Sequence, residues 1–129
     1  MTSDLWALVA TIVLAMIQLG ASSILSLRQL GPDWILSARD EPREVTGISA
    51  RIVRAHRNLL EIFPQFVAAL LVVHAAGEAS VWSAWGAWVF FAARLAYVPA
   101  YAFAPPGVRP AFWMIGQFGI LAILVDIFV

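Results

Sequence analysis

Long apolar segments dominate this chain and restrict the folds it can adopt more than any other feature. Four of them, at about 5–27, 51–76, 81–103 and 109–129, match the roughly 20 residues with which a helix crosses a bilayer. Hydrophobic residues make up 62% of the 129 residues and charged residues 12%, whereas soluble domains are roughly 45–50% apolar and about a quarter charged. The sequence therefore predicts a single all-α domain over 1–129, folded as a four-helix transmembrane bundle.

Arginines gather at one end of the predicted bundle, which bears on its orientation. All eight basic residues are arginine, a composition typical of GC-rich bacterial genomes. Six of them surround the first loop, namely Arg28, Arg39, Arg43, Arg51, Arg54 and Arg57. Arg94 and Arg109 lie toward the same side. Because basic residues favour cytoplasmic loops, we expect a multi-pass protein of the bacterial inner membrane, with the first and third loops in the cytoplasm and both termini outside.

The absence of cysteine limits the chemistry that the chain itself can supply. There can be no disulfide, no thiolate metal site and no cysteine nucleophile. Any thiol chemistry must therefore use a thiol that a ligand brings. We expect neither a metal ion nor a nucleic acid as a partner.

A polar stripe follows one face of the predicted second span, in the segment 51-RIVRAHRNLLEIFPQF-66. At about 100° per residue, six polar side chains fall within an arc of about 120°. These are Arg51, Arg54, Arg57, Asn58, Glu61 and Gln65. Polar groups inside a bilayer usually face a bundle interior or a wet cavity, because a charge left in hydrocarbon costs several kcal/mol. The stripe therefore indicates a binding surface.

A purely structural interpretation of this stripe stays open. Arg51 and Arg54 could extend to lipid headgroups, and Glu61 could serve as the internal partner of an arginine on the same helix. His56 falls outside the arc, and the sequence assigns it no role.

A second stripe lies in 94-RLAYVPAY-101, on the predicted third span. Arg94, Tyr97 and Tyr101 are spaced i, i+3, i+7 and share one face, although the tyrosines could also be interfacial anchors. Arg94 needs an acceptor inside the membrane, and Glu61 is a candidate. Arg109 opens the fourth span, where it is either an anchor or a further site residue. Together the two stripes predict a cavity for a small anionic or zwitterionic ligand, with arginines holding carboxylates and Glu61 holding an ammonium group.

Both motifs resemble those of one known family, the membrane-associated proteins in eicosanoid and glutathione metabolism (MAPEG). The segment 54-RAHRNLLEIFP-64 resembles the family's R-A-x-x-N-x-x-E-x-x-P signature, and 94-RLAYVPAY-101 resembles its R-x-x-Y/H-x-x-x-Y run. The resemblance covers essentially the whole chain and is closest to microsomal glutathione transferases. It implies a homotrimer with glutathione bound between neighbouring subunits, near the cytoplasmic side.

The resemblance also implies roles for individual residues. The glutathione-binding set would comprise Arg51, Arg54, Arg57, Asn58, Glu61, Arg94, Tyr97 and Tyr101, with both tyrosines supplied by the adjacent subunit. Arg109 would be catalytic, because a cation lowers the pKa of a thiol from about 8.5 and so increases the thiolate fraction. Glutathione would act as co-substrate, and the thiolate would attack a lipophilic electrophile or a hydroperoxide dissolved in the membrane lipid.

Two other functions are alternatives to this transferase or peroxidase. A non-catalytic lipid-binding or scaffold protein of the same family would need neither Asn58 nor Glu61. A four-helix multidrug exporter would need an acidic residue in the first span, where no charge lies between Asp4 and Arg28. That span instead contains small residues, among them Gly20 and Ser22, which suit close helix packing.

Overall fold

The computed structural model describes residues 1–129 and contains helices only. Four long helices and one short helix follow one another along the chain. They are α1 Ser3–Leu30, α2 Pro32–Leu36, α3 Gly47–Ala76, α4 Val81–Phe103 and α5 Val108–Val125. The long helices lie close to the four predicted segments, so the prediction of an all-α fold is confirmed.

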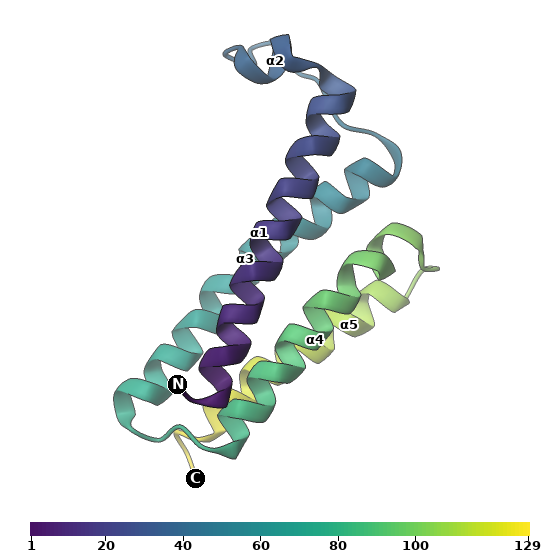
Figure 1. Cartoon of the computed structure of the whole chain (residues 1–129). Coiled ribbons are helices and arrows are strands. Elements are labelled where there is room, and N and C mark those ends of the chain that lie inside the picture. The colour runs from purple at the N-terminus through teal and green to yellow at the C-terminus, as the bar shows by residue number, and fades with distance from the viewer.

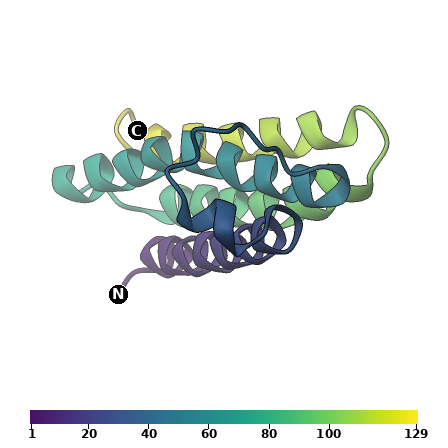
Figure 2. The same ribbon diagram turned by 90° about the horizontal axis from the view of Figure 1, so that it is seen from above.

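The long helices pack in an order that places α3 and α4 between the other two (Figures 1 and 2). α1 contacts α3 and α4, α5 packs mainly on α4 and also touches α3, and α1 makes no contact with α5. Both termini lie at one end of the molecule, and α2 lies at the opposite end (Figure 1). The side chains of the polar stripes must therefore meet where α3 faces α4 and α5.

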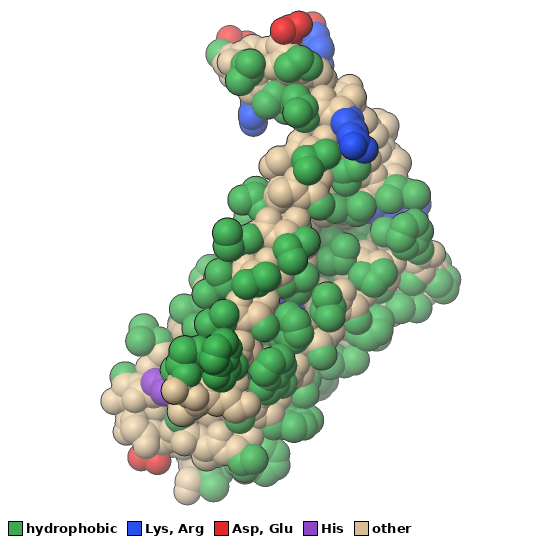
Figure 3. Space-filling model, viewed as in Figure 1, with side chains coloured by type: hydrophobic (Ala, Val, Ile, Leu, Met, Phe, Trp, Pro, Cys, Tyr) green, Lys and Arg blue, Asp and Glu red, His purple; other side chains and the backbone are tan.

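Three of the helices, α1, α3 and α5, are long and apolar enough to cross a membrane. α4 has a suitable length but a less apolar composition, because it carries three tryptophans, two tyrosines and Arg94. Three helices thus support an integral membrane protein, and the fourth crossing stays a prediction. Apolar side chains cover the middle of the face seen in Figure 3, while most charges lie toward its ends, as expected of a surface in contact with lipid.

The long first loop contains structure that the sequence analysis did not predict. α2 forms within it, with Pro32 in its first turn, where the missing N–H of proline costs nothing. The loop is closed at its base by Gln29, whose amide nitrogen donates to the carbonyl of Thr46 at 3.2 Å and whose amide oxygen accepts from the backbone N–H of Thr46 at 2.9 Å. This pair joins the end of α1 to the start of α3.

Close packing holds α3, α4 and α5 together in the half of the molecule near the termini. A Cβ added to Gly119 of α5 would lie 2.7 Å from the backbone oxygen of Gly86 on α4, so both helices need glycine there. Phe66 of α3 stacks on Phe90 of α4 with ring centroids 4.1 Å apart. The close approach predicted for the first span does not occur at Gly20, where a Cβ would meet nothing within 4 Å.

Two hydrogen-bonded carboxylates connect helices at the end of the molecule where the termini lie. Oδ2 of Asp4 lies 2.8 Å from Nε2 of His74 on α3. Asp126 accepts bonds from the hydroxyl of Ser80 at 2.6 Å and from the backbone N–H groups of Ser80 and Ser83 at 3.0 Å, at the start of α4. Burial raises the pKa of Asp126, but the hydrogen bonds from Ser80 and Ser83 outweigh it and hold that pKa below its ordinary value.

Candidate functional site

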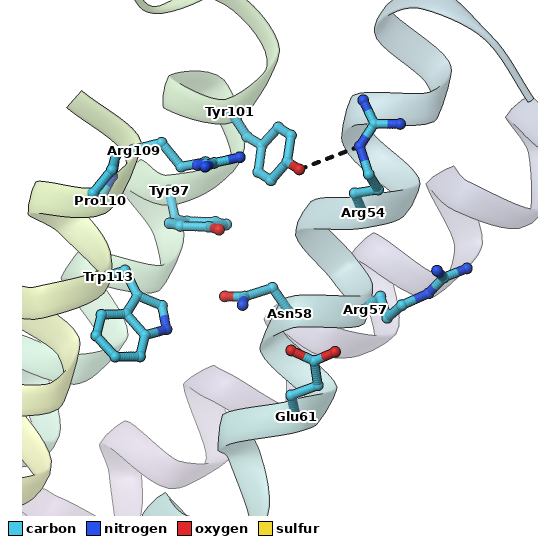
Figure 4. Close-up of a pocket in the computed structure, with 9 residues that line it drawn as sticks. All are labelled: Arg54, Arg57, Asn58, Glu61, Tyr97, Tyr101, Arg109, Pro110 and Trp113. Carbon is cyan, nitrogen blue, oxygen red and sulfur yellow. Dashed lines mark hydrogen bonds between the residues drawn. The ribbon is translucent and has the colours of Figure 1, made fainter. Parts of the chain in front are cut away.

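A pocket of about 420 Å³ lies between α3 on one side and α4 and α5 on the other (Figure 4). Its lining includes seven of the nine residues predicted for the site: Arg54, Arg57, Asn58, Glu61, Tyr97, Tyr101 and Arg109. Pro110 and Trp113 complete it. The polar side chains come from one face of α3 and one face of α4, as the helical spacing predicted, and from Arg109 in the first turn of α5. The volume is within the range of about 300–1,000 Å³ typical of small-molecule sites.

Two arginines flank Tyr101 at one end of the pocket. Nε of Arg54 donates a hydrogen bond to the Tyr101 hydroxyl at 3.2 Å. The guanidinium carbon of Arg109 lies 4.8 Å from the centre of the Tyr101 ring, a distance at which a cation is attracted to the ring face. Tyr101 thus positions two cations that come from different helices (Figure 4).

Glu61 lies away from this pair, farther along α3 (Figure 4). The only ion pairs in the chain join Arg43 to Glu41 and His74 to Asp4. The suggestion that Glu61 neutralises an arginine of α3, or Arg94, is therefore wrong. The neighbouring arginines extend in other directions, which leaves the carboxylate of Glu61 without a cationic partner in the chain.

Arg57 and Arg51 occupy the margins of the site. The Arg57 side chain extends away from Tyr97 and Trp113 (Figure 4) and also lines a hollow beside Ser22 of α1. Arg51 does not line the pocket, because Nη1 of its guanidinium donates to the carbonyl of Ala102 at 2.8 Å. Helix periodicity predicts the direction in which a side chain leaves the helix axis, but it does not predict the group on another helix with which that side chain forms a hydrogen bond.

Arg94 does not line the pocket but contacts Tyr97, which does. It is 1% exposed, and its guanidinium carbon lies 4.1 Å from the centre of the Tyr97 ring. Two of its nitrogens, Nε and Nη1, have no hydrogen-bond partner. Arg94 therefore packs against a residue of the pocket without lining the pocket itself.

The sequence analysis missed Trp113, although a signal for it exists. Trp113 follows Arg109 by four residues, so the two share one face of α5. Within one chain, Tyr97 and Tyr101 line the same pocket as Arg54 and Asn58. The contribution of these tyrosines to a site on a neighbouring subunit stays a prediction.

The charges of the pocket do not cancel one another. Three guanidinium groups and a single carboxylate line it, and none of the four belongs to an ion pair. The amide oxygen of Asn58 is buried and also lacks a partner. Unpaired polar groups around a cavity are costly unless a ligand or water meets them. The arrangement suits a ligand with more than one negative group and one positive group.

The sequence model of the MAPEG family matches residues 5–129, so the chain belongs to this family of membrane proteins in eicosanoid and glutathione metabolism. Membership argues against the exporter interpretation. No curated protein and no solved structure matches the chain.

Proposed function

We propose that this MAPEG protein binds glutathione in the pocket between α3, α4 and α5 and activates its thiol as a membrane transferase or peroxidase. The observation that carries the proposal is the set of charges around one cavity that lack an ionic partner, namely Arg54, Arg57 and Arg109 together with a single carboxylate, Glu61. Glutathione has two carboxylates and one ammonium group, which is the complementary set of charges.

Each polar residue of the pocket has a part in this assignment. Arg54 and Arg57 bind the carboxylates, since a planar guanidinium suits the bidentate geometry of a carboxylate. Glu61 binds the ammonium group, and Asn58 bonds to the peptide backbone of the ligand. Tyr97 and Tyr101 contribute hydroxyl groups. Arg51 and Arg94 do not line the pocket, so we assign them outside direct contact.

Arg109 is the proposed thiol-activating residue. Its guanidinium favours the thiolate over the thiol, so that the thiol proton leaves to water at a lower pH. In a transferase reaction the thiolate sulfur forms a bond to an electrophilic carbon, and the leaving group departs with the bonding electrons. In a peroxidase reaction the thiolate sulfur attacks the terminal hydroperoxide oxygen, the O–O bond breaks, and the alcohol leaves after taking a proton from water. The sulfur is then a sulfenic acid, and the thiol of a second glutathione reacts with it to give the disulfide and water.

Lipophilic co-substrates are expected to reach the pocket from the bilayer, since apolar side chains cover the surface of the helices. Family membership also leads us to propose a homotrimer with the arginine-rich end in the cytoplasm, where glutathione is dissolved. Crosslinking in membranes tests the trimer, and reactivity of single introduced cysteines toward an impermeant reagent tests the orientation.

The decisive experiment measures the ultraviolet absorbance of the glutathione thiolate upon addition of the purified protein at neutral pH. We expect a thiolate signal with the unmodified protein, a weaker signal with Arg109→Ala despite retained binding, and an unchanged signal with Arg28→Gln, an exposed arginine outside the pocket. Absence of saturable glutathione binding to the unmodified protein would refute the proposal and favour a non-catalytic lipid-binding protein.

A further inference from the structure

A second hollow of about 450 Å³ adjoins the pocket at the arginine-rich end of the molecule. We call it the vestibule and define it by Arg51, Arg54, Tyr101, Arg109 and the loop 104–107, all of which line it. It shares two arginines with the pocket. Arg51 and the loop line the vestibule but not the pocket, whereas Tyr101 and Pro110 line both spaces.

Three cations converge on the vestibule without a counter-charge. Arg51, Arg54 and Arg109 are all exposed, and none of them has a carboxylate within 4.0 Å. No acidic residue lines the space. Guanidinium groups held close together repel one another, and an anion bound among them removes that repulsion.

The positions of these arginines are fixed by other contacts. Arg51 donates to the carbonyl of Ala102 at 2.8 Å, and Arg54 donates to the Tyr101 hydroxyl at 3.2 Å. Arg109 lies over the Tyr101 ring at 4.8 Å. Each contact uses only part of a guanidinium group, which has five N–H donors. Several donors per arginine therefore remain for a ligand, and their placement needs little rearrangement.

The start of α5 adds a weaker contribution to the same space. The helix begins at Val108 after Gly107, with no side-chain cap, and the loop before it lines the vestibule. Gly107 has a φ of 98°, a conformation that suits glycine. The N-terminus of a helix carries a partial positive charge, so it reinforces the preference of the three arginines for an anion.

We propose that the vestibule is a phosphate-binding site, formed by Arg51, Arg54 and Arg109, that holds a phosphomonoester or free phosphate beside the thiol pocket. A tetrahedral dianion offers enough acceptor oxygens for three guanidinium groups, and arginine is suited to phosphate recognition. The group has two possible sources, the headgroup of an anionic lipid and a soluble phosphate. Because Arg54 and Arg109 line both spaces, phosphate in the vestibule should weaken the binding of an anion in the pocket.

Binding of inorganic phosphate, measured by calorimetry without glutathione in an uncharged detergent, tests the site independently of the proposed enzyme activity. We expect saturable binding, a loss of affinity of about tenfold or more in Arg51→Gln, and substantial retention in Arg51→Lys, which keeps the charge. Pro106→Glu places an acid at the rim of the vestibule, on an exposed loop, and should weaken binding without removing a contact within the protein.

Arg43→Gln is the matched control, because Arg43 is an exposed arginine of the same end that pairs with Glu41 and does not line the vestibule. A second arm compares bilayer discs of phosphatidylcholine with discs that also contain phosphatidic acid. Retention of phosphatidic acid by the unmodified protein, but not by Arg51→Gln, identifies a lipid headgroup, whereas binding of free phosphate alone identifies a soluble ligand. The proposal is overturned if neither phosphate source binds, or if Arg43→Gln loses as much affinity as Arg51→Gln.

Discussion

The two ends of the molecule differ in whether their charged side chains have partners within the chain. At the terminal end, Asp4 pairs with His74, and Asp126 accepts bonds from Ser80 and Ser83. At the arginine-rich end, the charges that line the pocket have no ionic partner in the chain. Charges matched within the chain contribute to stability, while charges left unmatched around a cavity are available to a ligand. The comparison separates residues of similar chemistry into structural and functional sets.

The largest effect expected from this comparison is the loss of glutathione binding in Glu61→Gln. Removing one partner of a desolvated charge pair typically costs about 2–5 kcal/mol, so the dissociation constant should rise roughly thirtyfold or more. Since Glu61 has no ionic partner in the chain, the melting temperature should change little. Calorimetry in detergent measures the affinity, with Glu78→Gln at the other end as control. A large drop in melting temperature with intact binding would contradict the assignment.

Asp126→Ala should show the reverse pattern. The Ser83 backbone N–H and the Ser80 hydroxyl lose their acceptor at the start of α4, and the Ser80 backbone N–H keeps only its bond to the Ser83 hydroxyl. We expect this to lower the free energy of unfolding by about 2–4 kcal/mol. Glutathione affinity should stay unchanged. Thermal melts and binding titrations measure the two quantities, and Asp40→Asn in the exposed loop is the control. If the variant lost glutathione binding while keeping its stability, the assignment of a structural role to the terminal end and a binding role to the arginine-rich end would be contradicted.

A smaller effect is expected at the contact between α4 and α5. Gly119→Ala should destabilise the protein by about 1–3 kcal/mol, because the added Cβ would overlap the backbone of Gly86. Gly20→Ala is the matched control and should be neutral or slightly stabilising, since open space surrounds that position and alanine favours the helix. Thermal melts of the two variants should therefore differ, and equal melting temperatures would show that the close approach carries no stability.

The smallest effect concerns acid pH. The pKa of Asp126 is lowered in the folded protein, so its contribution is complete above its unfolded value of about 3.8 and is lost as the pH falls through the folded pKa. The melting temperature of the unmodified protein should fall in that range more steeply than that of Asp126→Asn. If the melting temperatures of the two proteins fell in parallel with decreasing pH, groups other than Asp126 would be responsible for the acid sensitivity.

Sequence periodicity sufficed for the helices and for most of the pocket. The spacing of Arg54, Asn58 and Glu61 on α3 and of Tyr97 and Tyr101 on α4 follows from the helix repeat alone, so their shared faces could be predicted. Contacts between distant parts of the chain could not be predicted in this way. The hydrogen bond of Arg51 to Ala102 spans 51 residues, and no local pattern reports it.

Local sequence patterns also could not predict other contacts that depend on how the helices pack. Burial of Arg94 against Tyr97 depends on how α4 and α5 pack, and its sequence neighbours do not encode that packing. The pairing of Asp4 with His74 joins residues 70 positions apart. Small residues marked α1 as a close-packing helix, yet the close approach lies between α4 and α5 at Gly86 and Gly119.

The stacked rings of Phe66 and Phe90 set the position of α3 relative to α4 at a point outside the pocket. Arg54 precedes Phe66 by twelve residues on α3, a distance of about 18 Å along a helix that rises 1.5 Å per residue. Rotating α3 by about 5° at that contact would displace Arg54 by about 1.6 Å over this length. The position of Arg54 beside Tyr101 is therefore sensitive to how Phe66 packs on Phe90, a contact that lies outside the pocket itself.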